Sequence, residues 1–431
     1  MTRPGINKYT FKEPDKEPTM KDQILKKIES YENYAIELQR GLTAIPALAP
    51  SSGGTGEYDK AKWLEGELKK LKFDSIEWIN APQKEAKNGI RPNVIARYKG
   101  KSNKKTIWFM AHLDVVPPGE AKLWKSDPYK MEIKDGRLIG RGVEDNQQAI
   151  VSSIMVVKAM MELDYRPEYD IALLFCADEE TGSGYGADYI SEKRPDIFGK
   201  DDMFFVPDSG EEDGAKIEVA EKSILWMKVT TKGKQCHASR PALGINAFKA
   251  ASELVTKYQS LYEKFPHKDP LYEPPISTFE PTKKEANVPN VNTLPGEDVF
   301  YMDCRVMPQY QLTEVKAEMK RLAGEVEKKF GVTVAFEPQQ EAQAAPPTDP
   351  NAPIVLALKK GIKEILGVEG KAYGIGGGTV AAFFRRLNLP VVVYSRLNES
   401  AHQPNEYCVI EHMMGDAKVF AVTTLLLCEQ K

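Results

Sequence analysis

Four short, continuous apolar runs restrict the folds that this chain of 431 residues can adopt. They have the length of buried strands and lie at 106–111, 171–176, 202–206 and 390–394. Because helical patterns separate them, we expect an α/β fold with a doubly wound, mostly parallel sheet. Metal-competent polar side chains follow each run, the last one at a short distance. In open sheets of this kind ligands bind at the carboxyl ends of the strands, so we expect the functional site there.

The first run is followed by His112 and Asp114, which stand two residues apart and therefore face the same side of the strand end. In this arrangement a carboxylate can accept the second ring N–H of a metal-bound histidine and fix its tautomer. Asp145 lies just before a helical pattern at 147–163, from where it can reach back over the strand end. The segment thus offers a ligand, an orienting group and a bridging carboxylate.

The other strand ends supply further candidates: Glu179 and Glu180 after the second run, Asp208 after the third and His402 after the fourth. Taken singly, each candidate has an ordinary explanation. His112 could be a hydrogen-bonded core histidine and His402 a loop histidine, the two glutamates could belong to a solvated turn, and Asp208 could cap a turn. All of these explanations holding at once is much harder to accept. Adjacent residues after a strand point in different directions, so one glutamate can bind a metal while the other faces a water.

Composition narrows the classes of function. The formal net charge of −3 gives no electrostatic case for binding nucleic acid or an anionic membrane surface. The apolar runs are far shorter than the roughly 18 residues of a membrane span, and we recognise no signal peptide. The 5 cysteines are scattered without CxxC spacing, which argues against a disulfide framework or a thiolate zinc site. We therefore expect a cytoplasmic protein.

The residue pattern changes between residues 221 and 338. Strand-like and helix-like stretches follow one another there in the order 223–229, 246–265, 276–280, 299–306, 312–330 and 332–336. This series is typical of a split-βαβ, ferredoxin-like α+β domain. We expect a catalytic domain in two parts, 1–220 and 339–431, interrupted by a lid or dimerisation domain at 221–338. At the N-terminus, we expect a loosely held arm over about the first 20 residues and one amphipathic helix over 22–42.

Six motifs occur along the chain in the order HLDVVP, GRGVEDN, DEETG, PDSG, GKQCHASRP and SAHQPNE. Together they resemble the co-catalytic zinc metallopeptidases and deacylases. That family includes acetylornithine deacetylase, succinyl-diaminopimelate desuccinylase, aminoacylase, glutamate carboxypeptidase and carnosine dipeptidase. The resemblance covers the chain from about residue 22 to the C-terminus. It implies a hydrolase that uses two zinc ions, with cobalt or manganese as possible substitutes, to cleave an N-acyl amino acid or a dipeptide.

Carried over to this sequence, the resemblance implies that Asp145 bridges the two metal ions. His112 and Asp208 would complete one site, and Glu180 and His402 the other. These residue types agree with the implied metal, because nitrogen and carboxylate ligands suit zinc and leave a position open for water. The resemblance also implies a cis peptide bond after Asp145.

The resemblance assigns further roles to Glu179, as the general base, and to Asp114, as the carboxylate that orients His112. His237, in the fifth motif, would reach an active site, often that of a partner subunit, and stabilise the tetrahedral oxyanion. The plain alternative for His237 is a loop histidine beside a proline turn. We accordingly expect a homodimer formed through the insertion, with the strand near 223–229 or the one near 276–280 at a sheet edge.

Three residues are candidates for binding the substrate. Asn292 and Arg305 resemble the family's binders of the substrate carboxylate, and a planar guanidinium suits that group, although an exposed strand arginine is the plain alternative. The glycine-rich loop around Gly377 can hold a carboxylate with its amides, because a helix is expected to begin at about Val380. This loop lacks the Lys–Ser/Thr pair of a nucleotide-binding P-loop.

The sequence departs from the family after Asp145, where Asn146-Gln147-Gln148 stands, and after Thr379, where Val380-Ala381 stands. These departures leave the substrate open. The preferred reading is a deacetylase or desuccinylase, and the alternative within the enzyme class is a dipeptidase or carboxypeptidase. A metal-bound, non-catalytic binding protein is the alternative outside it. Glu179 argues against the last one, since a pure binder needs no second carboxylate facing the metal-bound water.

Overall fold

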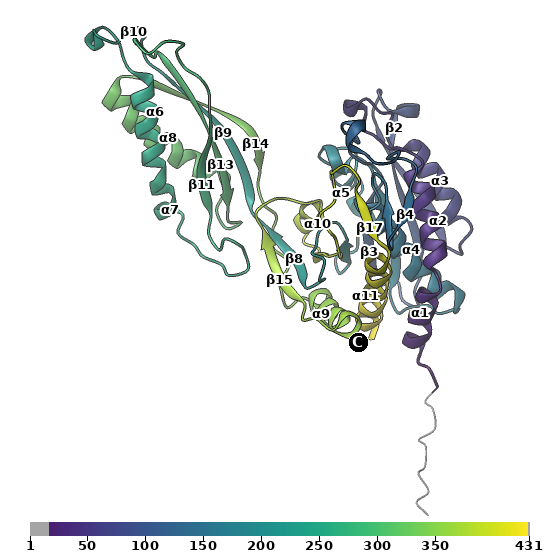
Figure 1. Cartoon of the computed structure of the whole chain (residues 1–431). Helices are drawn as coiled ribbons and strands as arrows, with labels where there is room; N and C mark the ends of the chain where they lie inside the picture. Colours follow the sequence, from purple (N-terminus) through teal and green to yellow (C-terminus); the bar gives the residue numbers. More distant parts are fainter. Residues whose placement is uncertain (1–16, 430–431) are drawn as a thin grey trace, which may run out of the picture.

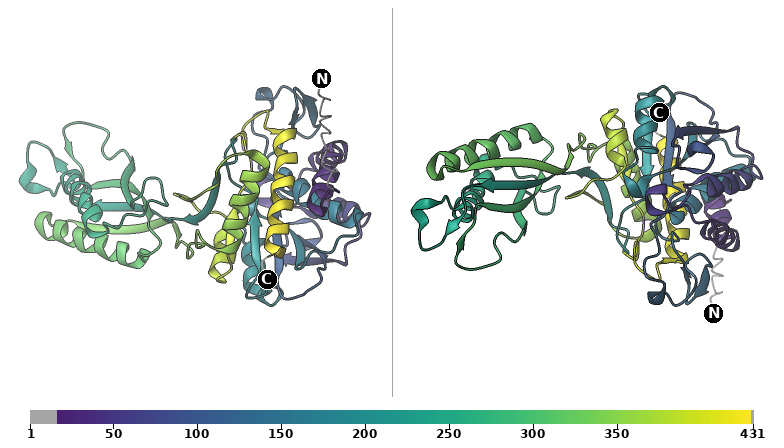
Figure 2. Two further views of the ribbon diagram at one scale, coloured as in Figure 1. Left: turned by 90° about the horizontal axis from the view of Figure 1, so that it is seen from below. Right: turned by 90° about the horizontal axis from the view of Figure 1, so that it is seen from above.

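The structure is a computed structural model that describes residues 17–429, so most of the expected N-terminal arm lies outside the described residues. It consists of a larger unit built on an eight-stranded sheet and an elongated insertion built on a four-stranded sheet (Figure 1). Two further views show the insertion extending away from the larger unit (Figure 2). Among residues 17–429 no helix is both long enough and apolar enough to cross a membrane.

The large sheet is mixed and mostly parallel, which confirms the expected fold class. In spatial order its strands are β1 (Ser75–Pro82), β2 (Ile90–Tyr98), β6 (Asp170–Cys176), β3 (Thr106–His112), β7 (Met203–Val206), β16 (Val391–Val393), β8 (Lys216–Glu221) and β15 (Lys371–Ile375). β3 pairs in parallel with both β6 and β7, and β7 pairs in parallel with β16. The carboxyl ends of these four strands therefore lie at one edge of the sheet.

Helices cover both faces of this sheet. One face packs against α1 (Met20–Glu29), α2 (Glu32–Thr43), α3 (Tyr58–Leu68), α4 (Gln147–Glu162), α9 (Pro353–Leu366) and α11 (Ile410–Glu429). The other face packs against α5 (Ala187–Lys193) and α10 (Ala381–Arg386). The helix expected over 22–42 is in fact two helices, because α1 ends at Glu29 and the N–H of Ser30, its C-cap residue, donates to carbonyls of the last turn. The break lets both α1 and α2 pack against α4.

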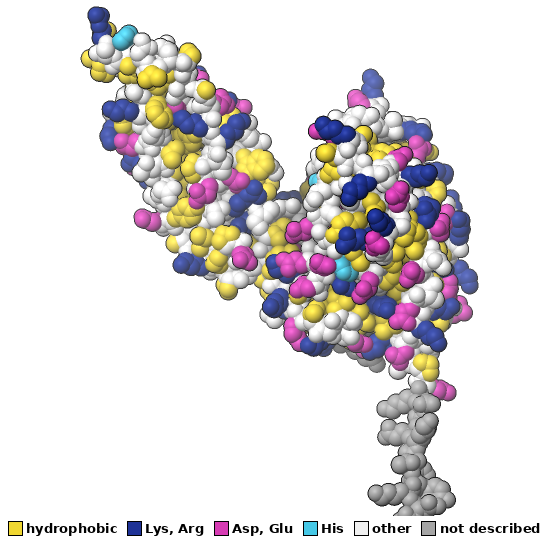
Figure 3. Space-filling view, viewed as in Figure 1, with side chains coloured by type: hydrophobic (Ala, Val, Ile, Leu, Met, Phe, Trp, Pro, Cys, Tyr) yellow, Lys and Arg dark blue, Asp and Glu magenta, His cyan; other side chains and the backbone are white. Residues whose placement is uncertain are grey.

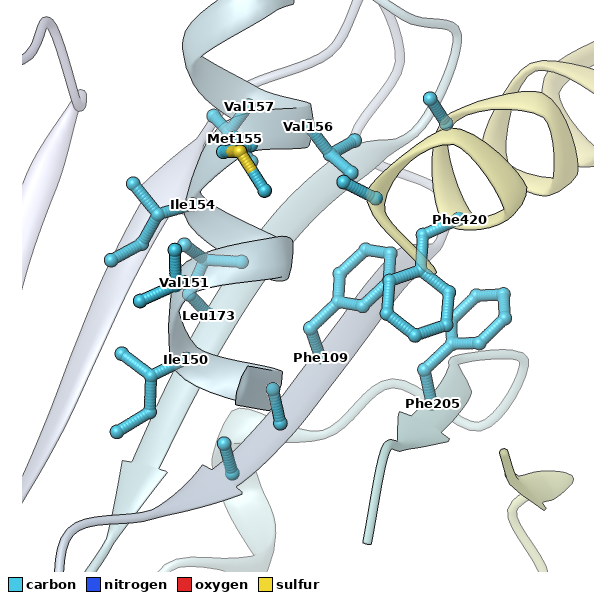
Figure 4. Close-up of a cluster of buried hydrophobic side chains, with 14 of the residues drawn as sticks. Phe109, Ile150, Val151, Ile154, Met155, Val156, Val157, Leu173, Phe205 and Phe420 are labelled. Carbon is cyan, nitrogen blue, oxygen red and sulfur yellow. The ribbon is translucent and has the colours of Figure 1, made fainter. Parts of the chain in front are cut away.

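Alternation along the strands distributes the core between the two faces. Phe109 stacks on Phe205 with ring centroids 4.8 Å apart, and Phe420 of α11 closes over both rings (Figure 4). On the opposite face Trp108 stacks on Phe204 at 5.5 Å. α4 is apolar on nearly all sides because it lies between the sheet and other helices. This packing makes the strand ends a rigid support for the side chains that follow them.

The insertion has the strand order β11 (Thr278–Lys284), β13 (Glu297–Val306), β9 (Ser223–Lys232) and β14 (Thr333–Ala342), all antiparallel. One face of this sheet packs against α6 (Ala247–Lys257), α7 (Leu261–Lys264) and α8 (Leu312–Phe330). The order is that of a ferredoxin-like fold, as expected. Of the two strands expected at an edge, only β11 lies there, because β9 is paired on both sides. The domain boundaries at 220 and 338 stay a prediction.

Two small sheets complete the described structure. One consists of β4 (Glu132–Lys134), β5 (Arg137–Ile139) and β17 (Tyr407–Val409), and the other of β10 (Cys236–His237) and β12 (Thr293–Leu294). β10 lies at the end of the insertion farthest from the larger unit (Figure 1). The space-filling view shows an open cleft between the two units above their junction (Figure 3).

Candidate metal centre

The topology brings the strand-end residues together. β3 ends in His112 and lies between β6, which precedes Glu179 and Glu180, and β7, which precedes Asp208. Asp145 stands before α4, and His402 stands on the loop between β16 and β17. The structure therefore collects all five residues expected to ligate metal, from three strand ends, one loop and one helix start, at the same edge of the sheet.

The first triad consists of His112, Asp145 and Asp208. Nε2 of His112 lies 2.8 Å from Oδ1 of Asp145 and 3.6 Å from Oδ1 of Asp208. The three potential ligand atoms lie within 4.8 Å of one another. Two carboxylate oxygens and an imidazole nitrogen are ligands that zinc accepts.

The second triad consists of Asp145, Glu180 and His402, with its ligand atoms again within 4.8 Å of one another. Nε2 of His402 lies 3.1 Å from Oδ2 of Asp145 and 3.0 Å from Oε2 of Glu180. Asp145 thus turns a different oxygen toward each histidine, which is the geometry of a bridging carboxylate. The other oxygen of Glu180, Oε1, is buried without a hydrogen-bond partner among the described residues. An acceptor buried in this way is what a cation would satisfy, so the residues fit a pair of metal ions.

Hydrogen bonds between Asp145 and the two histidines shift the pKa values of all three side chains. Burial alone would lower the pKa of His112, but hydrogen bonds to Asp114, Asp145 and Asp208 raise that pKa well above its usual value. Hydrogen bonds to Asp145 and Glu180 raise the pKa of His402 to about 10. Burial would raise the pKa of Asp145, yet its hydrogen bonds with both histidines lower it. Because the pKa values of both histidines are raised, protons and metal ions compete for the same ring nitrogens.

Glu179 differs from its neighbour Glu180. Its Oε2 lies 4.0 Å from Nε2 of His112, beyond hydrogen-bonding distance, and it belongs to neither triad. Burial raises the pKa of Glu179 well above its usual value, and the negative charge of Asp208 adds to the effect. A carboxyl group beside the metal ligands, with a raised proton affinity and no ligand role, is suited to proton transfer.

Asp114 contacts both His112 and the turn that carries Glu179 and Glu180. The acceptor nearest to Nδ1 of His112 is the main-chain carbonyl oxygen of Asp114 at 3.0 Å, while the Asp114 carboxylate lies 3.4 Å away. That carboxylate also accepts the backbone N–H groups of Glu179 at 3.1 Å and of Glu180 at 3.0 Å. The orienting role expected for the side chain stays a prediction. The structure adds that this carboxylate holds the turn that carries both glutamates.

A buried ion pair that the sequence did not reveal supports the same turn. Arg91 of β2 binds both carboxylate oxygens of Glu57, at 2.6 Å through Nε, and its Nη1 lies 3.1 Å from Oδ1 of Asp178. Glu57 also accepts the backbone N–H of Asp178 at 3.2 Å. Asp178 has a φ of +64°, a conformation that a non-glycine residue rarely adopts. These contacts hold the chain in that conformation immediately before Glu179.

Glu406 holds the loop that presents Asp145. Its carboxylate accepts Arg141 at 2.6 Å and the backbone N–H groups of Gly142, Glu144 and Asp145 at 2.9, 3.0 and 3.1 Å. The peptide bond after Asp145 is cis, as expected. The next residue, Asn146, donates to Oδ1 of Asp208 at 2.6 Å. The first departure from the family pattern is thus in contact with a ligand.

The residues expected to bind the substrate or to stabilise the oxyanion lie in two separate places. His237 lies on β10 and is exposed at the far end of the insertion, and the backbone carbonyl of Asn292 accepts the N–H of neighbouring Ala238 at 2.8 Å (Figure 1). Arg305 on β13 binds the Asp303 carboxylate through Nε and Nη2 at 2.7 and 3.0 Å. Its Nη1 donates to the carbonyl of Gly376 at 3.0 Å, beside Gly377. The structure therefore brings Arg305 to the glycine loop but leaves His237 and Asn292 away from the metal centre of the same chain.

Comparisons with known proteins agree with this site. Residues 108–425 match Peptidase family M20/M25/M40. An uncharacterized metallohydrolase of Methanocaldococcus jannaschii is 40% identical over 405 residues, which span 90% of this chain and 97% of that protein. A succinyl-diaminopimelate desuccinylase of Nitratiruptor is 25% identical over 373 residues, or 86% of this chain and 93% of the enzyme.

Among solved structures, human carnosine dipeptidase 1 superposes with a TM-score of 0.66 and covers 96% of this chain and 99% of its own. At 17% identity this likeness supports the fold alone. The family match extends over more than half of the chain and includes His112, Asp145 and His402. With the relative at 40% identity, it follows that the chain belongs to the M20/M25/M40 peptidase family and is a metallohydrolase of amide or peptide bonds.

Proposed function

We propose that this metallohydrolase is a two-zinc amidohydrolase that removes the acyl group from an N-acyl amino acid. The observation that carries the proposal is that Asp145 belongs to both triads, while Glu179 lies beside them and belongs to neither. Zinc ions held by these triads, or cobalt or manganese ions in their place, would acidify a bound water and polarise the scissile carbonyl.

The side chains of this chain divide the remaining work. Glu179 accepts the proton of the attacking water on its carboxylate and returns it to the leaving amine. Asp114, through its contacts with His112 and with the backbone of Glu179, keeps ligand and base in a fixed relation. Arg305, which donates to the carbonyl of Gly376, and the amides around Gly377 are proposed to orient the carboxylate of the amino-acid product.

Sequence similarity supports a deacylase over a dipeptidase. The Nitratiruptor relative, which is named a desuccinylase, aligns over 86% of this chain, whereas the likeness to a dipeptidase is one of fold. The amide bond that is cleaved is of the same kind in both classes, so the metal centre does not distinguish them. The distinction has to come from the parts of the site that bind the acyl group.

We further propose a homodimer formed through the insertion. His237 is exposed at the end of the insertion and lies far from the metal centre of its own chain. Edge strand β11 and the exposed side chains of Phe248 and Val291 also belong to the insertion. In such a dimer His237 would serve the site of the partner subunit as an oxyanion donor.

A hydrolysis screen tests the proposed activity. Acetyl-, succinyl- and formyl-amino acids and a set of dipeptides are incubated with protein loaded with zinc, cobalt or manganese, and free amine is measured. We expect turnover of at least one acyl class in excess of every dipeptide. Asp145→Asn is the control, because loss of the bridging carboxylate should abolish both bound metal and turnover. Cleavage of dipeptides alone would favour the dipeptidase, and metal binding without any turnover would favour the binding protein.

A further inference from the structure

A pocket of about 290 Å³ lies where the two units join, and Glu179 forms part of its wall. The start of β9 and the segment that follows β14, up to Ala344, line one side of it. The loop from Gly378 to Val380 and helix α10 line another. The pocket is therefore continuous with the proposed general base but is built from residues that the metal centre does not use.

Four charged side chains line this pocket: Glu179, Glu221, Lys222 and Arg386. Glu221 is held by hydrogen bonds and by a cation, Arg385, that it shares with buried Glu218. Its Oε1 accepts the backbone N–H and the hydroxyl of Thr379 at 3.0 and 2.5 Å and lies 3.3 Å from Nη1 of buried Arg385. Glu221 is thus engaged by the protein itself, whereas Glu179 lies beside the metal ligands.

The two cations are paired differently. The ammonium group of Lys222 donates to the carbonyl oxygens of Pro274 and Ile276, both at 2.7 Å. Arg386 donates through Nη2 to the carbonyl of Gln343 at 3.0 Å. Within residues 17–429 neither cation forms an ion pair with a carboxylate oxygen within 4.0 Å, and the charge of Arg386 acts on Glu221 only from a longer distance.

Arg386 is the more accessible of the two cations. It is exposed, and its guanidinium lies 5.3 Å from the ring of Phe383, which also lines the pocket. A guanidinium has five N–H donors, and its bond to the Gln343 carbonyl leaves most of them available.

We propose that this pocket binds a carboxylate group of the substrate other than the one common to all N-acyl amino acids, and that Arg386 selects it. This inference rests on the proposed amidohydrolase function and names its substrate class: N-acyl amino acids with an additional carboxylate. The group can come from a dicarboxylic acyl chain such as succinyl or from an acidic amino acid. Both sources present the same planar anion, which a guanidinium binds with two parallel hydrogen bonds.

Two pairs of substrates of matched shape separate these sources. N-Succinyl-leucine is compared with N-succinamoyl-leucine, and N-acetylglutamate with N-acetylglutamine, so that each pair differs only by carboxylate against carboxamide. We expect wild-type kcat/KM to favour the carboxylate by about 10-fold or more in at least one pair, the scale of a hydrogen bond to a charged group. Arg386→Gln should reduce this ratio to about 3-fold or less, and Arg386→Lys should keep part of it. Arg321→Gln, an exposed arginine on α8, is the matched control and should leave the ratio unchanged.

A binding measurement makes the test independent of turnover. Glutarate and its monoamide, glutaramate, are titrated calorimetrically into metal-loaded wild type and Arg386→Gln. We expect the wild type to bind glutarate about 10-fold or more tightly than glutaramate and Arg386→Gln to lose this difference. A ratio near one in the wild type, or one that survives in Arg386→Gln, would overturn the inference. If no substrate is hydrolysed yet the binding difference behaves as expected, the proposed function fails while the anion pocket stands.

Discussion

Two adjacent carboxylates, Glu179 and Glu180, have different surroundings at the metal centre. Oε2 of Glu180 lies 3.0 Å from His402 within a triad, whereas Glu179 stays 4.0 Å from the nearest ligand nitrogen. Proton transfer and metal binding make different demands on a carboxylate, because a base needs a basic oxygen while a ligand needs a negative charge. The two roles should therefore separate in mutants of equal size.

We predict that Glu179→Gln lowers turnover by at least about 100-fold, the lower range for removal of a general base, while its metal content stays near that of wild type. Glu180→Gln should instead lose the metal of the second triad, because it removes an anionic ligand. Metal analysis paired with turnover of both variants decides the matter. Loss of metal in Glu179→Gln, with retention in Glu180→Gln, would reverse the two roles.

The raised pKa values of His112 and His402 predict how metal binding depends on pH. Hydrogen bonds raise the pKa of His402 to about 10, so without metal its ring carries a proton at neutral pH, and hydrogen bonds shift the pKa of His112 upward against the effect of burial. Because a metal ligand must be neutral imidazole, loading should release protons at about pH 7, and affinity should fall as the pH is lowered. Calorimetric titration with zinc in two buffers of different ionisation enthalpy measures this release. Proton uptake, or equal heats in both buffers, would contradict it.

At the scale of single elements, the turn that follows β6 depends on the buried pair formed by Glu57 and Arg91. Removal of one partner leaves the other charge buried and unpaired, at a cost of about 3–5 kcal/mol. We predict that Arg91→Met lowers the free energy of unfolding by about this amount in denaturant titrations. The double variant Glu57→Gln/Arg91→Met should recover part of the loss, because the charge of Glu57 is gone and only Asp178 keeps a charge without Arg91. An Arg91→Met variant as stable as wild type would show that the pair does not support this turn.

The elements predicted correctly from the sequence are those with a clear local pattern of apolar residues. β3, β6 and α8 follow from apolar runs or helical spacing, and the metal-centre residues follow from polar groups at strand ends. β8 and β15 were not predicted. Only Lys222 separates β8 from β9, so no turn signal marks the end of β8, and β15 is short and contains a glycine. Glu57, Arg91 and Glu406 also escaped, because their partners lie far away in the sequence and no local spacing marks such contacts.

At the scale of the whole molecule, the insertion is joined to the larger unit by two chain crossings, one at Lys222 and one after Ala342. Arg305 and Arg386 add contacts near these crossings, to the carbonyls of Gly376 and Gln343. The opposite end of the insertion, with β10, extends far from the metal centre across the open cleft (Figures 1 and 3). If His237 takes part in the reaction, it must be brought to a metal centre by closure of the insertion or supplied by a second subunit.

Mixing two inactive variants distinguishes these possibilities. His237→Ala lacks the donor and Glu179→Gln lacks the base, so each alone should be nearly inactive. In a heterodimer, the site with intact Glu179 receives His237 from the other chain, and random exchange should restore about a quarter of wild-type activity. Sedimentation of each preparation shows whether dimers are present at the assay concentration. If His237 acts within its own chain, mixing restores nothing, and a fully active monomer would remove the dimer from the mechanism altogether.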